Sequence, residues 1–217
     1  MTSAQVTNVG APGGALAPGD GPVLALDVVL PRNGYADDVL NGIRVVNLGS
    51  AVTTDVAELR LWGDGGDGVF SAGGGDDRDL GPFAALGGAW QSPVLSEPLA
   101  GAGARLFVAL RTAAAAADSA TVRLAIPVGG VTVQSGNDGP LDRAVENEQA
   151  LLISTSPLLA TLQISPAAST VGQSVTVRMV VRNAGGETVT GIAPSALDSS
   201  GTAGLAPANG PLPVAVD

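Results

Sequence analysis

The sequence contains no cysteine, no histidine and no lysine, so its ten basic residues are all arginine. Without cysteine and histidine the chain has no disulfide, no thiol nucleophile, no Ser-His-Asp triad and no His/Cys zinc site. Without lysine it has no Schiff-base residue and no P-loop lysine for phosphate. Aromatic residues are also scarce, at 3%. These absences remove most common catalytic groups, and we expect a protein that is not an enzyme.

Acidic residues outnumber basic ones by twenty to ten, which gives a net charge of −10 over 217 residues. Such a chain does not neutralise phosphates, so we expect no nucleic-acid partner and no binding to anionic membranes. The longest apolar stretch, residues 150–164, is interrupted by polar residues and Pro157. It is too short and too polar to cross a bilayer. We therefore predict no membrane insertion.

Short stretches of alternating apolar and polar residues recur along the chain, separated by turns rich in its 31 glycines and 15 prolines. In residues 24–30, 57–62, 105–111 and 121–126, every second side chain is aliphatic. A repeat of two is typical of strands with one buried face, whereas no stretch of 11 residues shows a helical stripe. The pattern predicts an all-β protein built of immunoglobulin-like β-sandwich units.

The pattern stops near residues 154–157 and then restarts, which indicates two sandwich units in series. We expect a Gly/Pro-rich flexible arm or donor strand at residues 1–22, a β-sandwich at 23–157 and a partial immunoglobulin-like sandwich at 158–217. An immunoglobulin-like sandwich takes roughly 100 residues, so the second unit is incomplete within this chain. Either the polypeptide continues, or another chain supplies the missing strands.

Two stretches resemble repeats of bacterial surface proteins. Residues 55–70, DVAELRLWGDGGDGVF, have a strand ending in tryptophan, an Asp/Gly loop and a further apolar stretch. With RLFV at 105–108 and IPVGGV at 126–131, residues 23–154 resemble a β-sandwich repeat of large bacterial surface and secreted proteins. Residues 164–213, with VGQSVTV at 171–177 and VRNAGG at 181–186, are similar to adhesion-type immunoglobulin-like modules. The resemblance implies extracellular, non-catalytic sandwiches that act as spacers, stalks or adhesive surfaces.

The acidic loop between residues 63 and 79 is the candidate metal site. Calcium takes six to eight oxygen ligands, and carboxylates on a glycine-rich loop can converge to supply them. The candidate calcium ligands are Asp64, Asp67, Asp76, Asp77 and Asp79. The alternative is a solvated Asp/Gly hairpin loop in which Arg78 is the counter-charge. The spacing is not that of an EF-hand, and no glutamate closes the loop.

Two further groups of residues, the tryptophans and the glutamates, are candidates for a binding or catalytic site. Trp62 and Trp90, the only tryptophans, can form a sugar-stacking platform, or each can cover part of the core. The glutamates that could pair for glycoside hydrolysis are scattered, and nothing in the sequence places two together. They are Glu58, Glu97, Glu146 and Glu148.

These observations lead to one expected function and two competitors. We expect a non-catalytic protein outside the cell or on its surface, either a segment of a stalk or adhesin or a filament subunit joined by β-strand contacts. Its partners would be copies of itself or neighbouring domains of a longer surface protein. The first competitor is a carbohydrate-binding accessory module, and the second is a calcium-stabilised spacer. The lack of lysine beside abundant alanine, glycine and arginine points to a GC-rich bacterial source.

Overall fold

The computed structural model describes residues 1–32, 36–73, 75–101, 103–155, 158–165, 170, 172–173, 175–183, 189–192 and 214–216. The chain divides into two compact units, Met1–Thr155 and Ser156–Asp217. The protein is all-β, as the alternation predicts, and the helical turns in the described part are the 3-10 segments η1 (Ser3–Gln5) and η2 (Thr53–Asp55). In this part of the chain, no helix has the length and apolarity needed to cross a membrane.

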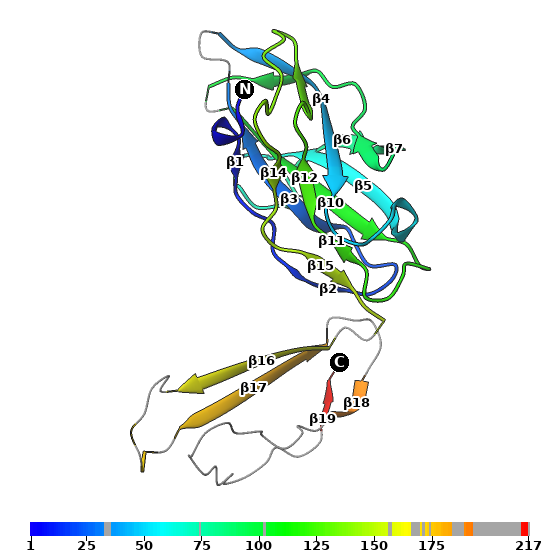
Figure 1. Cartoon of the computed structure of the whole chain (residues 1–217), viewed down its shortest axis with the longest axis vertical. Helices are drawn as coiled ribbons and strands as arrows, with labels where there is room; N and C mark the ends of the chain where they lie inside the picture. Colours follow the sequence, from blue (N-terminus) through cyan, green and yellow to red (C-terminus); the bar gives the residue numbers. More distant parts are fainter. Residues whose placement is uncertain are drawn as a thin grey trace. The chain divides into compact units, whose positions relative to one another are not determined.

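Unit 1 is a β-sandwich, and one of its layers is a five-stranded sheet with the order β1-β3-β10-β5-β6 (Figure 1). The strands pair antiparallel throughout. They are β1 (Thr7–Asn8), β3 (Val23–Leu30), β10 (Ala104–Thr112), β5 (Val56–Gly63) and β6 (Arg78–Pro82). Because β10 lies between β3 and β5, three strands from distant parts of the sequence form the centre of this layer.

The facing layer is built around the ten-residue strand β4 (Asp38–Asn47), which pairs with four shorter strands. These are β8 (Ala89–Gln91), β9 (Glu97–Leu99), β12 (Leu124–Ile126) and β13 (Val131–Val133). The outer strands β7 (Ala84–Leu86) and β14 (Val145–Glu146) pair with β8 and β12. A small third sheet has the order β11-β15-β2, formed by β11 (Thr121–Val122), β15 (Leu151–Ile153) and β2 (Gly14–Leu16).

The core lies between the two layers and consists of the alternate side chains that the sequence pattern placed inward. On β3, Leu26, Val28 and Leu30 are fully buried, and they pack with aliphatic residues of the other strands in one cluster. Those residues include Leu59 and Leu61 of β5, Leu106, Val108 and Leu110 of β10, and Leu40, Ile43 and Val45 of β4. Burying each leucine contributes about 2 kcal/mol. The remaining side chains of β5 and β10 therefore lie on the outer face of the five-stranded sheet.

Residues 1–22 belong to unit 1 in the structure, whereas the sequence predicted a flexible arm or donor strand. Strand β1 extends the five-stranded sheet at β3, and β2 pairs parallel with β15. Four apolar side chains of this segment are buried, namely Met1, Val6, Ala11 and Leu16. They occur at every fifth position, which matches neither the strand nor the helix period, so periodicity could not identify them.

Unit 2 begins two residues before the predicted boundary at 157/158. Its described part contains two antiparallel pairs, β16 (Leu158–Ser165) with β17 (Thr176–Asn183), and β18 (Val189–Ile192) with β19 (Val214–Val216). The first pair is in unbroken register over eight positions. The predicted turn at 184–186 and much of the module-like stretch at 193–213 lie outside the described residues.

Candidate functional site

The outer face of the five-stranded sheet carries a row of polar and aromatic side chains. Because Leu59 and Leu61 point into the core, the alternate residues Glu58, Arg60 and Trp62 of β5 point outward. The register with β10 places Arg111 opposite Glu58, Ala109 opposite Arg60 and Phe107 opposite Trp62. This face therefore has an aromatic end, a small residue in the middle and a charged end.

The loop between β5 and β6 folds back over the aromatic end of this face. Phe70, from the loop, makes edge contacts with Trp62 at 6.0 Å and with Phe107 at 5.7 Å between ring centroids. Phe107 is consequently fully buried, although it lies on the outer side of the sheet. The three rings fix the loop to the sheet, because offset and edge contacts add to the free energy of burial.

A buried ion pair lies beside the aromatic cluster. Arg105 of β10 donates two hydrogen bonds to Asp27 of β3, from Nε to Oδ1 at 2.9 Å and from Nη2 to Oδ2 at 2.7 Å. Its guanidinium also lies 5.2 Å from the ring centroid of Phe107. The hydrogen bonds to Asp27, and then the charges of Asp64 and Asp67, raise the pKa of Arg105. Arg105 is therefore a counter-charge of the acidic loop.

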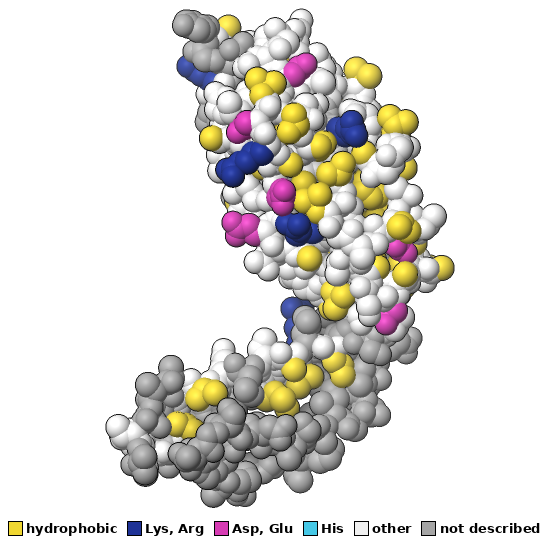
Figure 2. Space-filling model, in the orientation of Figure 1, with side chains coloured by type: hydrophobic (Ala, Val, Ile, Leu, Met, Phe, Trp, Pro, Cys, Tyr) yellow, Lys and Arg dark blue, Asp and Glu magenta, His cyan; other side chains and the backbone are white. Residues whose placement is uncertain are grey.

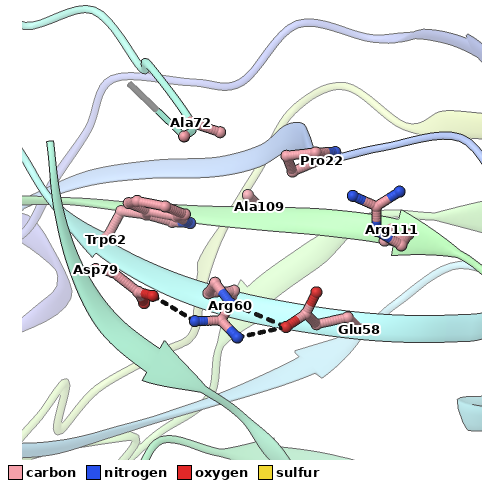
Figure 3. A pocket seen from close by; sticks show the side chains of 9 residues that line it. Pro22, Glu58, Arg60, Trp62, Ala72, Asp79, Ala109 and Arg111 are labelled. Atoms are coloured by element: carbon pink, nitrogen blue, oxygen red, sulfur yellow. Dashed lines mark hydrogen bonds and ion pairs between the residues drawn. The ribbon is translucent and has the colours of Figure 1, made fainter. Parts of the chain in front are cut away.

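A shallow depression of about 370 Å³ is hollowed into this face between the acidic loop and the segment that precedes β3. Figure 3 shows Trp62 at one end, Arg111 at the other and Ala109 between them. The depression is lined by Pro22, Glu58, Arg60, Trp62, Ala72, Gly73, Asp79, Ala109 and Arg111. The indole Nε1 of Trp62 is buried and has no hydrogen-bond partner in the described part of the chain.

Arg60 is held in place by two carboxylates in the depression. Its Nη2 lies 2.7 Å from Oε1 of Glu58, and its Nη1 pairs with Asp79 (Figure 3). The hydrogen bond to Glu58, assisted by the negative charge of Asp79, raises the pKa of Arg60. Because Glu58 lies on the same strand as Arg60 and Asp79 lies on the neighbouring strand β6, the guanidinium is presented in one orientation.

Most of the predicted calcium ligands accept hydrogen bonds from the loop's own backbone. Asp64 Oδ1 accepts from the amides of residues 66 and 68, and Asp67 Oδ1 accepts from residue 69. Asp77 accepts from residues 65 and 71, and Asp79 pairs with Arg60 and accepts from residue 81. Asp76 is exposed. Within the described residues, no three acidic side chains form a group that could hold a metal.

The expected counter-charge of this loop, Arg78, pairs instead with Glu97 at the start of β9. Arg60 and Arg105 neutralise the loop and its surroundings. Arg60 is 19 positions from Asp79 in sequence, and Arg105 is 78 positions from Asp27. Only strand pairing brings these groups together, so the local sequence pointed to the wrong arginine.

The two tryptophans lie on different sheets and do not form one platform. Trp62 lines the depression, whereas Trp90 of β8 belongs to the hydrophobic core and is 5% exposed. A smaller hollow of about 220 Å³ next to Trp90 is lined by Arg44, Leu86, Gly87, Ala89, Trp90 and Gln91. A sugar stacked on Trp62 would instead lie in the first depression, next to Arg60 and Arg111.

The four glutamates considered for glycoside hydrolysis lie apart. Glu58 pairs with Arg60, Glu97 with Arg78, and Glu146 with Arg123, each with an arginine of its own. Glu148 is exposed after β14. The structure thus gives three of these carboxylates an ion-pairing partner.

The fold and this face define an all-β sandwich protein with a polar depression on one sheet. Comparison of the chain with protein-family models, with curated proteins and with solved structures gives no match.

Proposed function

We propose that this chain is a non-catalytic structural protein of the cell surface or extracellular space, a stalk or adhesin segment or a filament subunit that assembles through β-strand contacts. The observation that supports this proposal is the β16–β17 ribbon of unit 2. Its register places Leu158, Ala160 and Ile164 of β16 on the same face as Met179 and Val181 of β17. Figure 2 shows hydrophobic side chains at the surface of this unit.

The apolar face of the ribbon is partly exposed. The exposed fractions are 37% for Leu158, 52% for Ile164 and 39% for Met179. The opposite face is mainly polar, with Thr161, Gln163 and Arg178, and also carries Val180. A two-stranded ribbon with one apolar face is marginally stable in water until something covers that face. Within the described residues β16 and β17 pair only with each other, so each has an edge for a further strand.

Sedimentation velocity of the whole chain over a range of concentrations tests this proposal. We expect the wild-type chain to associate as its concentration rises, and Ile164→Lys and Met179→Lys to weaken association, because a charge on the covered face must be desolvated. Gln163→Lys adds the same charge to the opposite face and should associate like wild type. Equal behaviour of all four proteins would contradict the proposal.

A second candidate function is carbohydrate binding, and the depression at Trp62 favours it. An indole beside fixed donors and acceptors is a common arrangement in small-ligand sites, and the volume is at the small end of their range. We expect immobilised glycans to retain the wild-type chain and not Trp62→Ala. Trp90→Phe, a change in the core, serves as the control, with circular dichroism to check folding. No retention on any glycan would remove this candidate.

A further inference from the structure

The depression contains one arginine that lacks an ion pair. Arg60 and Arg111 both line it, but Arg60 has two carboxylates, while Arg111 has no salt-bridge or side-chain hydrogen-bond partner among the described residues. Arg111 is half-buried. A partly desolvated guanidinium without a partner has lost hydration that an anionic ligand group can replace.

The cross-strand neighbour of Arg111 does not neutralise it. The register places Glu58 directly opposite on β5, at the distance where an ion pair forms most readily. Oε1 of Glu58 instead accepts from Nε of Arg60 at 2.9 Å and lies 2.7 Å from Nη2 of Arg60. The second arginine therefore remains available to a ligand.

The spacing along the strands gives the length of the ligand. Trp62 and Glu58 are four residues apart on β5, which corresponds to about 13 Å. Arg111 is the register partner of Glu58, so the backbone positions of Trp62 and Arg111 are offset by about the same length, with Ala109 between them (Figure 3). A single pyranose ring is too short to reach both ends, and a saccharide of two or more rings is long enough.

We propose that this depression binds a saccharide carrying one carboxylate, such as a uronate at the end of a neutral oligosaccharide, with the carboxylate paired to Arg111. The neutral rings would lie along Ala109 and Trp62, and their hydroxyl groups would meet Arg60 and the remaining oxygen of Glu58, Oε2. This inference rests on the carbohydrate-binding candidate above and names its ligand class and the residue that selects it.

A single carboxylate fits the depression better than a dense polyanion. Glu58 and Asp79 line the same depression, and the whole chain carries a net charge of −10. A row of ligand carboxylates would meet these negative charges, and the field of the protein would slow its approach. One carboxylate at Arg111 reduces both effects, because the acid beside it, Glu58, is already paired with Arg60.

The test uses two disaccharides that differ only in charge. Cellobiouronate carries one carboxylate, and cellobiose is its carboxyl-reduced counterpart. Both are titrated into the full chain by calorimetry, and an array of matched uronate and carboxyl-reduced oligosaccharides covers other linkages. We expect the uronate member to bind at least about ten-fold more tightly, because a hydrogen-bonded charge pair is added. Its affinity should fall with added salt, whereas that of the neutral member should not.

Arg111→Gln should bring the two ligands to equal affinity while leaving the neutral one unchanged. Arg111→Lys should retain part of the preference. Arg44→Gln, which removes an exposed arginine of the other sheet, is the control and should change neither. Equal binding of charged and neutral ligands that still depends on Trp62 would overturn this inference and leave carbohydrate binding standing. Binding of neither class on the array would overturn both.

Discussion

The carboxylate of Asp27 is buried on the outer side of the five-stranded sheet, and Arg105 from the neighbouring strand caps it with two hydrogen bonds. The side chains are 5% and 25% exposed, respectively. A buried carboxylate that loses its only cation keeps the cost of desolvation without the compensating attraction. Removing Arg105 alone should therefore destabilise the fold more than removing both charges together.

We predict that Arg105→Met lowers the free energy of unfolding by about 3 kcal/mol. The double variant Asp27→Asn with Arg105→Met should lose less than Arg105→Met alone, since no buried charge is left. Arg123→Met, at the exposed pair with Glu146, should cost less than about 1 kcal/mol. Urea unfolding measures all three, and a double variant that is less stable than the single one would refute this view of the pair.

Phe70 should be the anchor that holds the acidic loop on the sheet. Phe70→Ala removes the ring contacts of Phe70 with Trp62 and Phe107 and opens the buried ring of Phe107 to water. We expect a loss of about 2 kcal/mol, less than for a fully buried phenylalanine, and a weaker near-ultraviolet circular dichroism signal. Val69→Ala changes the exposed neighbour and should have almost no effect. Equal losses in the two variants would show that the ring contacts do not hold the loop.

The acidic loop should be organised by its backbone hydrogen bonds, and Asp77 is the residue that tests this. Its carboxylate accepts from the amide of Gly65, near the start of the loop, and from the amide of Ser71, near its middle. We expect Asp77→Ala to lower the melting temperature equally in calcium and in chelator. The adjacent Asp76→Ala should have little effect in either, because Asp76 forms no hydrogen bond in the described part of the chain. If calcium binds the loop, both substitutions will lower the melting temperature more in calcium than in chelator.

Acid should weaken the attachment of the N-terminal segment at Asp142. Its carboxylate accepts from the backbone amide of Ser3 at 2.6 Å and from the hydroxyl of Ser3 at 2.7 Å. These bonds lower the pKa of Asp142 from 3.8 to about 2, with the backbone bond as the larger cause. The folded pKa lies below the unfolded one, so this contribution is complete above about pH 4 and is lost as the pH falls toward 2.

Two measurements check this prediction. Asp142→Asn should show a smaller loss of stability than wild type when the pH is lowered through this range. Carbon NMR of the Asp142 carboxyl group should give a lower titration midpoint in wild type than in Ser3→Ala, which removes the hydroxyl donor. Identical pH profiles for wild type and Asp142→Asn would exclude Asp142 as a source of the acid sensitivity.

The alternating strands were predictable because the property that identifies them is local. Leu59 and Leu61 of β5, and Leu106 and Val108 of β10, show the strand period in sequence and are buried in the structure. The packed N-terminal segment was not predictable, because its buried residues are too far apart to form a periodic pattern. Its partners, such as β15, are also far away in sequence.

The same reasoning explains which parts of the site were found. Glu58, Arg60 and Trp62 share a face by simple alternation, so the sequence alone could group them. Arg111 joins them only through the pairing of β10 with β5, about 50 positions apart in the register. Asp27 alternates with the inward Leu26 and Val28 and so lies on the outer face, but its burial depends on Arg105 and on the returning loop. Long-range pairing thus decides the chemistry of this face.

Electron microscopy of the purified full chain, at low and at high concentration, tests the proposed role most directly. If the apolar face and open edges of the β16–β17 ribbon join one copy to the next, the grids will show single particles when dilute and ordered multimers or filaments when concentrated. Ile164→Lys should abolish the larger species. Single, separate particles at every concentration would contradict assembly through this ribbon.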